Sequence, residues 1–327
     1  MSQDNTTTFS KPKLISKNRL VVLAKFLIAG GLIYYLIQSV EYEQILAAVR
    51  NVNIVLIVSA VLLGVVNIYL QYFKWGQTCH EILFVRDKGK IFRSLFYGFS
   101  AGIITPFRVG EYFGRGIEFK DKSLFQVTVA TLVDKFFPLL MVASIGSISS
   151  LIFIYLFYDI SLYIVLSLFI VIFTFFYIVI LLMISPSFWN SVLFSRIKKT
   201  RRMRPLLEKL KTFEHLQKKY FYKMLIISFL FYSCYLIQYA LLVSAFSHHS
   251  EFINYLWAGN LIMFAKTIIP PVSFGELGIR EGASVFFITQ MGEVASVGFN
   301  ASIFLFMINL VIPAIIGVGM FLRKNEN

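Results

Sequence analysis

The chain has 327 residues, of which 57% are hydrophobic and 15% are charged, and its mean hydropathy is +0.74. A soluble domain of this length needs far more polar surface, so the composition excludes a soluble protein and predicts a polytopic helical membrane protein. The net charge of +14 does not indicate a nucleic-acid partner, because 11 of the 31 Lys and Arg residues lie in one segment, 196–223. Basic loops beside membrane spans are typical of the cytoplasmic side.

The first half of the chain predicts a charged, broken segment among apolar spans. In order we expect a basic tail at 1–19, spans at 20–40 and 54–73, a basic loop at 74–93, the charged segment at 94–119, and an apolar stretch at 124–157. The last stretch contains Asp134, Lys135 and Pro138, and it fits either one long tilted span or a kinked one. We assign residues 20–158 to a first membrane repeat.

The second half follows the same plan. We expect spans at 162–184 and 224–246 around a cytoplasmic basic loop at 185–223, then a charged, broken segment at 252–291, a final span at 297–322 and a short tail at 323–327. Residues 159–322 form the second membrane repeat in this reading.

A ten-residue pattern occurs once in each half. Residues 106–115 read PFRVGEYFGR and residues 271–280 read PVSFGELGIR, so both fit P-x3-G-E-x3-R at an offset of 165 residues. Each copy places charge and helix-breaking residues within an apolar sequence. Duplicated, broken membrane segments are typical of transport or lipid-handling cores built from two related halves.

The loop charges predict which segments cross the membrane. Basic loops and both termini are expected inside, whereas the turns at Asp159 and His248 are expected outside. In each half, two hydrophobic segments connect a part of the chain expected inside with a part expected outside. Only one of the two segments can therefore cross the membrane. We therefore predict an all-α inverted repeat of eight hydrophobic segments, with six spanning helices and two broken re-entrant hairpins. Eight full spans are the alternative.

The charged residues of the two broken segments are the candidate binding site. Broken helix ends expose N–H groups and a positive dipole end, and Arg binds phosphate through two hydrogen bonds. A carboxylate there could meet an amine of a head group. We expect head-group contacts from Arg108, Glu111, Arg115, Glu276, Arg280 and Glu281, and helix breaks or close backbone approach at Pro106, Gly110, Pro270, Pro271, Gly275 and Gly278.

The same charges also fit a purely structural role. In the first broken segment Arg108 and Arg115 balance Glu111 and Glu118. A charge at the bilayer centre costs roughly 2.5–3.5 kcal/mol, so these side chains must face protein or a wet cavity in either case. The sequence leaves open whether they bind a substrate or only one another.

Polar residues outside the motifs carry weaker signals. Asp134 and Lys135 point about 100° apart on a helix, so each is expected to meet a partner in the broken segments. We interpret them as structural ion pairs, with proton or ion coupling as the alternative. Asn67 and Gln71 are expected to be interfacial or packing residues. No metal-ligand cluster, nucleotide-binding loop or catalytic set is apparent, so we expect no metal, no cofactor and no catalytic residue.

The motifs resemble the flippase-like transmembrane region of lysylphosphatidylglycerol synthases, the family that includes bacterial multiple peptide resistance factors. The similar residues are TPFRVGE at 105–111 with Arg115, PPVSFGELGIREG at 270–282, and the acidic-basic pair Asp134-Lys135. Phe107 stands where that family usually has a small residue. The resemblance, which spans about residues 20–322, implies lipid translocation or head-group binding. We expect no aminoacyl-transferase domain, and synthase chemistry is not carried over.

The sequence therefore predicts a flippase-like protein of the plasma membrane that moves or binds a phospholipid or lipid-linked head group between two hairpins. An ion-coupled polar-solute transporter and a membrane-embedded head-group transferase are the alternatives. The expected partners are membrane lipids. The basic run at 198–204 suits the anionic inner leaflet, at roughly 1 kcal/mol per basic residue, and a separate partner enzyme could dock there.

Overall fold

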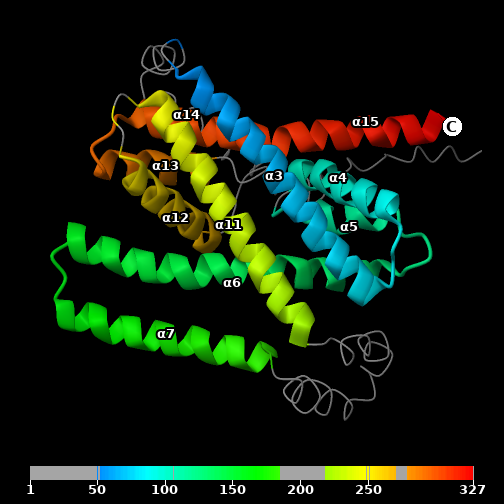
Figure 1. Cartoon of the computed structure of the whole chain (residues 1–327), viewed down its shortest axis with the longest axis horizontal. Coiled ribbons are helices and arrows are strands. Elements are labelled where there is room, and N and C mark those ends of the chain that lie inside the picture. The colour runs from blue at the N-terminus through cyan, green and yellow to red at the C-terminus, as the bar shows by residue number, and fades with distance from the viewer. Residues whose placement is uncertain are drawn as a thin grey trace, which may run out of the picture.

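The computed structural model describes residues 50, 52–105, 107–184, 218–247, 249, 251–269 and 278–326. These residues form helices joined by short turns, which confirms the all-α prediction (Figure 1). In chain order the helices are α3 (Ile54–Thr78), the π-helical turn η1 (Cys79–Leu83), α4 (Lys88–Ile104), α5 (Gly110–Gly116), α6 (Leu124–Phe157), α7 (Leu162–Ile184), α11 (Lys218–Phe246), α12 (Phe252–Ile268), α13 (Ile279–Gln290), α14 (Ala295–Phe306), the π-helical turn η5 (Met307–Val311) and α15 (Ile312–Glu326).

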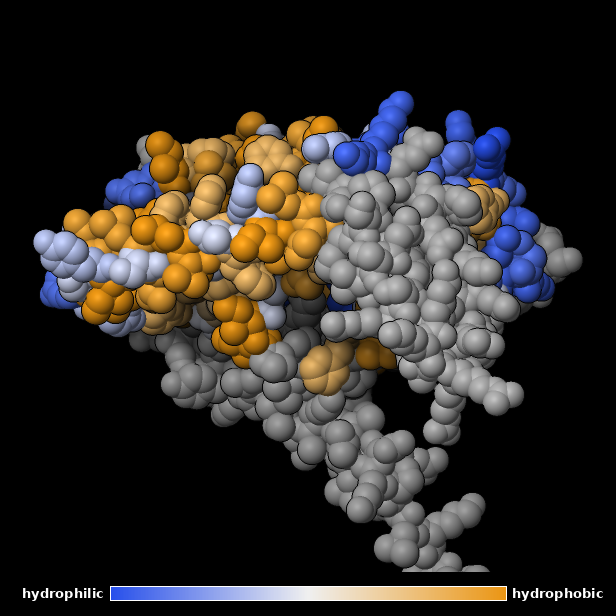
Figure 2. All heavy atoms as spheres, turned by 90° about the horizontal axis from the view of Figure 1, so that it is seen from below, coloured by the Kyte–Doolittle hydropathy of each residue, from blue (hydrophilic) through white to orange (hydrophobic). Residues whose placement is uncertain are grey.

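Five segments of the described chain are long and apolar enough to cross a membrane. They are Ile54–Leu83, Leu124–Phe157, Leu162–Leu182, Lys218–Phe246 and Ala295–Arg323. The span predicted at 20–40 lies outside the described residues. On the face drawn in Figure 2, hydrophobic side chains form a broad area from the left to the centre, and hydrophilic ones lie at the left edge and at the upper right. A broad apolar surface with polar edges fits a bilayer, and the protein is a multi-pass membrane protein.

Both broken segments form helical hairpins. α4 ends before Pro106, as helices commonly do at a proline, and α5 then packs back against α4. In the second half α12 and α13 pack together in the same way. Figure 1 shows the two hairpins towards opposite ends of the bundle, with α6 running the length between those ends. Each hairpin therefore enters and leaves at one end, as the re-entrant prediction requires.

The helices follow the duplication seen in the motifs. Shifting α3 by 165 residues gives 219–243, which lies within α11, and shifting α4 gives 253–269, which coincides with α12 to within one residue. α3 and α11 pack against each other and run in opposite directions (Figure 1). The two halves are therefore inverted with respect to each other.

The basic loop predicted at 74–93 is wrong in its extent. α3 and η1 continue to Leu83, and α4 already begins at Lys88. Lys74, which the sequence placed in the loop, is buried in the last turns of α3 next to the fully buried Trp75. A charge count treats a lysine after an apolar run as the end of a span, but this lysine has buried partners.

The stretch 124–157 is one helix despite Pro138. Ser123 and Gln126 start it with a capping box. Proline has no N–H, so Pro138 cannot donate to the carbonyl of Asp134 one turn earlier. That carbonyl instead accepts a hydrogen bond from Lys74 Nζ, at 2.6 Å. A side chain from α3 thus replaces the missing backbone donor, and α6 continues without a break.

Two glycines of the first hairpin make the close approach of α4 and α5 possible. A Cβ on Gly110 would lie 2.1 Å from the carbonyl oxygen of Ala101, and one on Gly114 would lie 2.4 Å from that of Tyr97. Gly110→Ala and Gly114→Ala should each lower the free energy of unfolding by about 1–3 kcal/mol through overpacking. Thermal unfolding of the purified protein in detergent would measure this. The matched control is Gly76→Ala on α3, where a Cβ meets no atom within 4 Å. Equal melting temperatures for all three variants would contradict the packing argument.

Candidate functional site

The turn between α4 and α5 has an unusual backbone. Phe107 and Arg108 both have positive φ, at 55° and 52°. Residues other than glycine seldom adopt this conformation, and it costs on the order of 1–3 kcal/mol when the surrounding structure imposes it. The Thr105 hydroxyl accepts a hydrogen bond from Gly110 N at 2.7 Å and so secures the start of α5. The strained turn places Arg108 beside the first carboxylate of α5.

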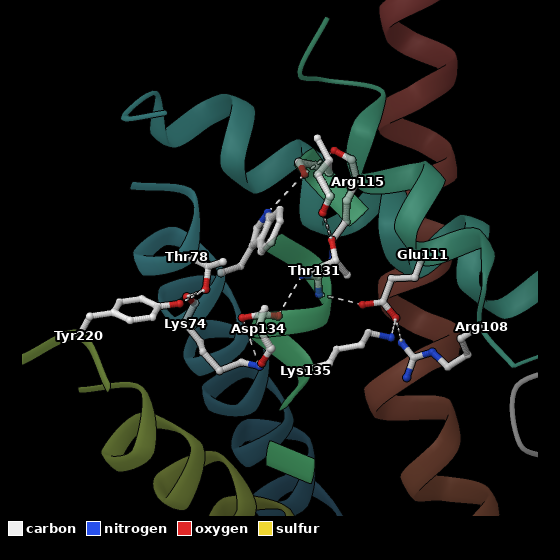
Figure 3. Close-up of polar contacts among 12 residues, drawn as sticks. Lys74, Thr78, Arg108, Glu111, Arg115, Thr131, Asp134, Lys135 and Tyr220 are labelled. Atoms are coloured by element: carbon white, nitrogen blue, oxygen red, sulfur yellow. Dashed lines mark hydrogen bonds and ion pairs between the residues drawn. The ribbon is translucent and has the colours of Figure 1, made fainter. Parts of the chain in front are cut away.

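Glu111 is the centre of the site (Figure 3). Its Oε1 lies 2.8 Å from Arg115 Nη2, and its Oε2 lies 3.0 Å from Arg108 Nη2 and 2.6 Å from Lys135 Nζ. The Glu111 side chain is 3% exposed, whereas the Arg108 and Lys135 side chains are 22% and 31% exposed. One buried carboxylate thus has three cations, and two of them also reach open space.

Arg115 joins the hairpin to α6. Its Nη1 lies 2.9 Å from Asp134 Oδ2, and its guanidinium lies 4.3 Å from the centroid of the Trp75 ring. Its backbone carbonyl accepts a hydrogen bond from the buried Ser94 hydroxyl. Arg115 thus uses both terminal nitrogens on carboxylates and its face on an aromatic ring, so its main partners lie within the protein.

Asp134 extends the ion pairs to α3. Its Oδ1 lies 3.2 Å from Lys74 Nζ, which also donates to the Asp134 carbonyl. Near this pair, Thr78 on α3 and Tyr220 on α11 share a hydrogen bond of 3.2 Å between their hydroxyls. Asp134 and Lys135 therefore pair with Arg115 and Glu111 of the first broken segment, respectively.

The charges of this cluster do not balance as the sequence predicted. Glu118, which the sequence counted with these charges, pairs with Arg93 at 3.2 Å. The cluster of Lys74, Arg108, Glu111, Arg115, Asp134 and Lys135 holds four cations and two carboxylates. A buried surplus of positive charge is costly unless an anion or water compensates it. The arrangement therefore favours an anionic ligand.

The cluster opens on a cavity of about 570 Å³ between the two halves. The first half contributes side chains from α3, α4, α5 and α6, and the second half contributes α11, α12, α13, α14 and η5. The charged and amide residues that line it are Asn67, Gln71, Lys74, Arg108, Glu111, Arg115, Asp134, Lys135, Lys266, Arg280 and Asn309. Both hairpins thus reach one site, as their duplicated charges suggested.

In the second hairpin the arginine of the motif pairs with the glutamate next to it in the sequence. Arg280 Nη2 lies 2.5 Å from Glu281 Oε1, and Arg280 Nε donates to the Ser302 hydroxyl at 3.1 Å. Glu281 is fully buried and its other oxygen accepts from Gly278 N, where φ is 91°. Glu281 therefore caps α13, while Arg280 reaches the cavity wall. Among the sequence candidates, Pro106, Pro270, Pro271, Gly275 and Glu276 lie outside the described residues.

Sequence reasoning missed several cavity residues. Lys74 was assigned to a loop, and Asn67 and Gln71 to packing, yet all three line the cavity from one face of α3. Their spacing of three to four residues is the signal that could have grouped them. Asn309 gave no signal, because its position depends on the π-helical turn η5.

Within the described residues no group of His, Cys, Asp and Glu side chains could hold a metal ion.

The comparisons with known proteins give one match. The family model described as the lysylphosphatidylglycerol synthase TM region matches residues 22–317, which is most of the chain. No curated protein and no solved structure gives a significant match.

The contacts of Arg115 predict a structural role. Arg115→Ala would leave two buried carboxylates with fewer partners, so we expect the free energy of unfolding to fall by about 3–5 kcal/mol. Arg115→Lys should recover little of this loss, because one ammonium cannot pair with both carboxylates and cover the Trp75 ring. Thermal unfolding in detergent would measure both variants. Lys122→Ala removes a pair with the exposed Asp121 at the surface and should change the stability by less than about 1 kcal/mol. An Arg115→Ala protein as stable as this control would refute the assignment.

Proposed function

Because the chain belongs to the family of the lysylphosphatidylglycerol synthase transmembrane region, we propose that it is a flippase-like protein. In this proposal the cavity between the two hairpins binds the phosphate of a phospholipid or lipid-linked head group and carries it across the bilayer. The family supports a role in lipid modification or transport, and the cavity supports the binding site.

Arg108 and Lys135 are the proposed phosphate ligands. Both converge on the same oxygen of Glu111 and both are partly exposed in the cavity. An arginine fork and a lysine ammonium are the usual partners of phosphate oxygens. A phosphate that binds between them would use the positive charge that Glu111 and Asp134 leave uncompensated. Arg115, which the sequence placed among the head-group ligands, would instead hold Glu111 in position.

An apolar groove beside the cavity is the observation that favours a lipid over a polar solute. The groove has a volume of about 370 Å³ and is lined by Ile145, Ile148, Ser149, Ile152 and Leu156 of α6 and by Trp257 and Asn260 of α12. The groove adjoins the charged cavity on both helices. On α6 its residue Ile145 lies one turn after Val142, and on α12 its residue Asn260 lies one turn before Met263. Val142 and Met263 both line the charged cavity. A soluble substrate needs no such extension.

The length of the groove suits an acyl chain. From Ile145 to Leu156 it follows α6 for about 17 Å at roughly 1.5 Å per residue. This is roughly half of a hydrocarbon core of about 30 Å, which is the thickness of one leaflet. A lipid could place its head group in the charged cavity and an acyl chain along α6 and α12. The hydrogen bond between Tyr232, which lines the cavity, and Asn260, which lines the groove, lies where the two adjoin.

The remaining assignments follow from this proposal. We place the protein in the plasma membrane with both termini in the cytoplasm, because the basic loops indicate that side. The basic run at 198–204, which lies outside the described residues, would rest on the anionic inner leaflet or dock a separate enzyme. We propose transport without catalysis. A purified protein that chemically changes a lipid head group would favour the transferase alternative.

The phosphate ligands can be tested by leaflet exchange. In liposomes that contain a fluorescent anionic phospholipid, Arg108→Ala and Lys135→Gln should each slow exchange by roughly tenfold or more, since each removes a charged hydrogen bond worth about 1.5–3 kcal/mol. Outer-leaflet quenching would follow the exchange. Arg93→Ala is the matched control, because Arg93 pairs with Glu118 away from the cavity. Wild-type rates in both cavity variants would rule out this phosphate site.

The groove can be tested by filling it. Ile148→Trp would occupy the space beside α12, so lipid exchange should slow several-fold although every charge remains in place. Ile164→Trp on α7, where the side chain is exposed, makes the same change at a surface that would face bulk lipid. Slow exchange in the Ile148 variant alone would support an acyl-chain path. Equal rates in the two variants would favour a polar-solute carrier, for which uptake of radiolabelled solutes is the next measurement.

A further inference from the structure

Lys74 is the most deeply buried of the described lysines that line the cavity. Its side chain is 5% exposed, that of Lys135 is 31% exposed, and Lys266 is half-buried. Arginine stays protonated in proteins, so among the cations of the cavity wall only the lysines can release a proton. A buried charge is costly without a compensating partner, and the cluster around Glu111 has more cations than carboxylates. Release of a proton from Lys74 relieves this surplus while no anion is bound.

The contacts of Lys74 suit an amine as well as an ammonium (Figure 3). Its Nζ lies 2.6 Å from the Asp134 carbonyl, which is a neutral acceptor, and 3.2 Å from Asp134 Oδ1. The other oxygen of this carboxylate is paired with Arg115 at 2.9 Å. Lys135, by contrast, lies 2.6 Å from the Glu111 carboxylate, which is the spacing of a charge-assisted hydrogen bond. Lys74 thus keeps its closest partner in either protonation state, whereas Lys135 is held as an ammonium.

Lys74 is open to the cavity and closed towards η1. One turn further along α3, the Thr78 hydroxyl shares a hydrogen bond of 3.2 Å with the Tyr220 hydroxyl. Thr78, Tyr220 and the neighbouring Cys79 are buried, and none of the three is among the described residues that line the cavity. Within the described part of the chain, a proton therefore reaches Lys74 through the same cavity that would bind the head group.

The other charged groups near Lys74 are less suited to carry a proton. Glu111 contacts three cations and Asp134 contacts two, so both carboxylates stay ionised. The cavity wall also has three tyrosines, Tyr112, Tyr232 and Tyr235. An unperturbed tyrosine releases its proton only at about pH 10. The neighbouring elements α4 and η1 form ion pairs away from the cavity, Arg93 with Glu118 and His80 with Glu81.

We propose that the cavity carries its anionic head group together with a proton, and that Lys74 holds this proton. The inference rests on the proposed function and adds an energy source to it. When a phosphate enters, Lys74 Nζ takes up a proton from the side to which the cavity is open. The proton offsets the charge of the phosphate, so the cluster has the same net charge when filled and when empty. Release of the phosphate on the other side returns the proton to water and Lys74 to the amine.

A pH gradient across proteoliposomes tests the coupling. A short-chain fluorescent phosphatidylglycerol, whose phosphodiester does not titrate near neutral pH, is added from outside, and albumin extraction measures how much remains in the outer leaflet. Valinomycin with equal potassium on both sides holds the membrane potential at zero. With the outside more acidic by about one pH unit, the ratio of inner to outer lipid should approach about tenfold, because about one proton moves with each lipid.

Two substitutions test the assignment to Lys74. Lys74→Met removes the proton site, and Lys74→Arg keeps a charge that cannot be released. In both variants we expect slower exchange that stops at a ratio near one under the same gradient. Lys90→Met, which changes an exposed lysine on α4, is the matched control and should keep the wild-type ratio.

The outcomes separate this inference from the proposed function. Wild-type exchange that stops at a ratio near one would overturn the coupling and leave lipid translocation standing. A tenfold ratio in either Lys74 variant would overturn the assignment to Lys74. No entry of lipid into the inner leaflet with the wild-type protein, with or without a gradient, would overturn both proposals. The wild-type ratio decides the coupling even where a variant fails to fold.

Discussion

The buried carboxylate of Glu111 is the interaction on which the rest of the site depends. A carboxylate inside a membrane protein must be paired, because the surrounding medium cannot solvate it. Arg115 pairs with it and with Asp134, and Asp134 pairs with Lys74. This chain of ion pairs connects α5, α6 and α3 in sequence. The need to neutralise one charge thus brings three elements together, and the cavity forms where they meet.

Pro138 contributes to the same ion-pair cluster, although proline is usually regarded only as a helix breaker. Its missing N–H frees the Asp134 carbonyl, and Lys74 binds this carbonyl and the carboxylate of the same residue. The proline therefore supplies a second acceptor for a buried lysine at the point where the ion pairs reach α3. Without it, the carbonyl would be used within the helix, and of the two Asp134 acceptors Lys74 would retain only the carboxylate.

The parts of this architecture that follow local rules could be predicted from the sequence. Pro106 and the motif glycines predicted the break between α4 and α5, and the 165-residue offset predicted that α12 would correspond to α4. The ion-pair partners of Asp134 and Lys135 were expected in the hairpin, because charges in a span need internal partners. Lys74 was misplaced because a charge count carries no information about burial, although its spacing from Asn67 and Gln71 puts all three on one helix face. Asn309 could not be placed, because a π-helical turn changes which face of the helix a residue occupies.

The two halves of the repeat are alike in backbone but not in charge chemistry. Arg115 links two carboxylates on two helices, whereas Arg280 pairs with its own neighbour Glu281, which also caps α13. Phe107 and Arg108 adopt a left-handed backbone in the turn of the first hairpin. This turn places the Arg108 guanidinium 3.0 Å from the Glu111 carboxylate. Among the described cavity residues, the strained turn and Arg108 belong to the first hairpin and Lys135 to α6, while the second hairpin contributes Lys266 and Arg280. A binding site at the interface of two inverted halves can become asymmetric in this way without any change in the fold that creates it.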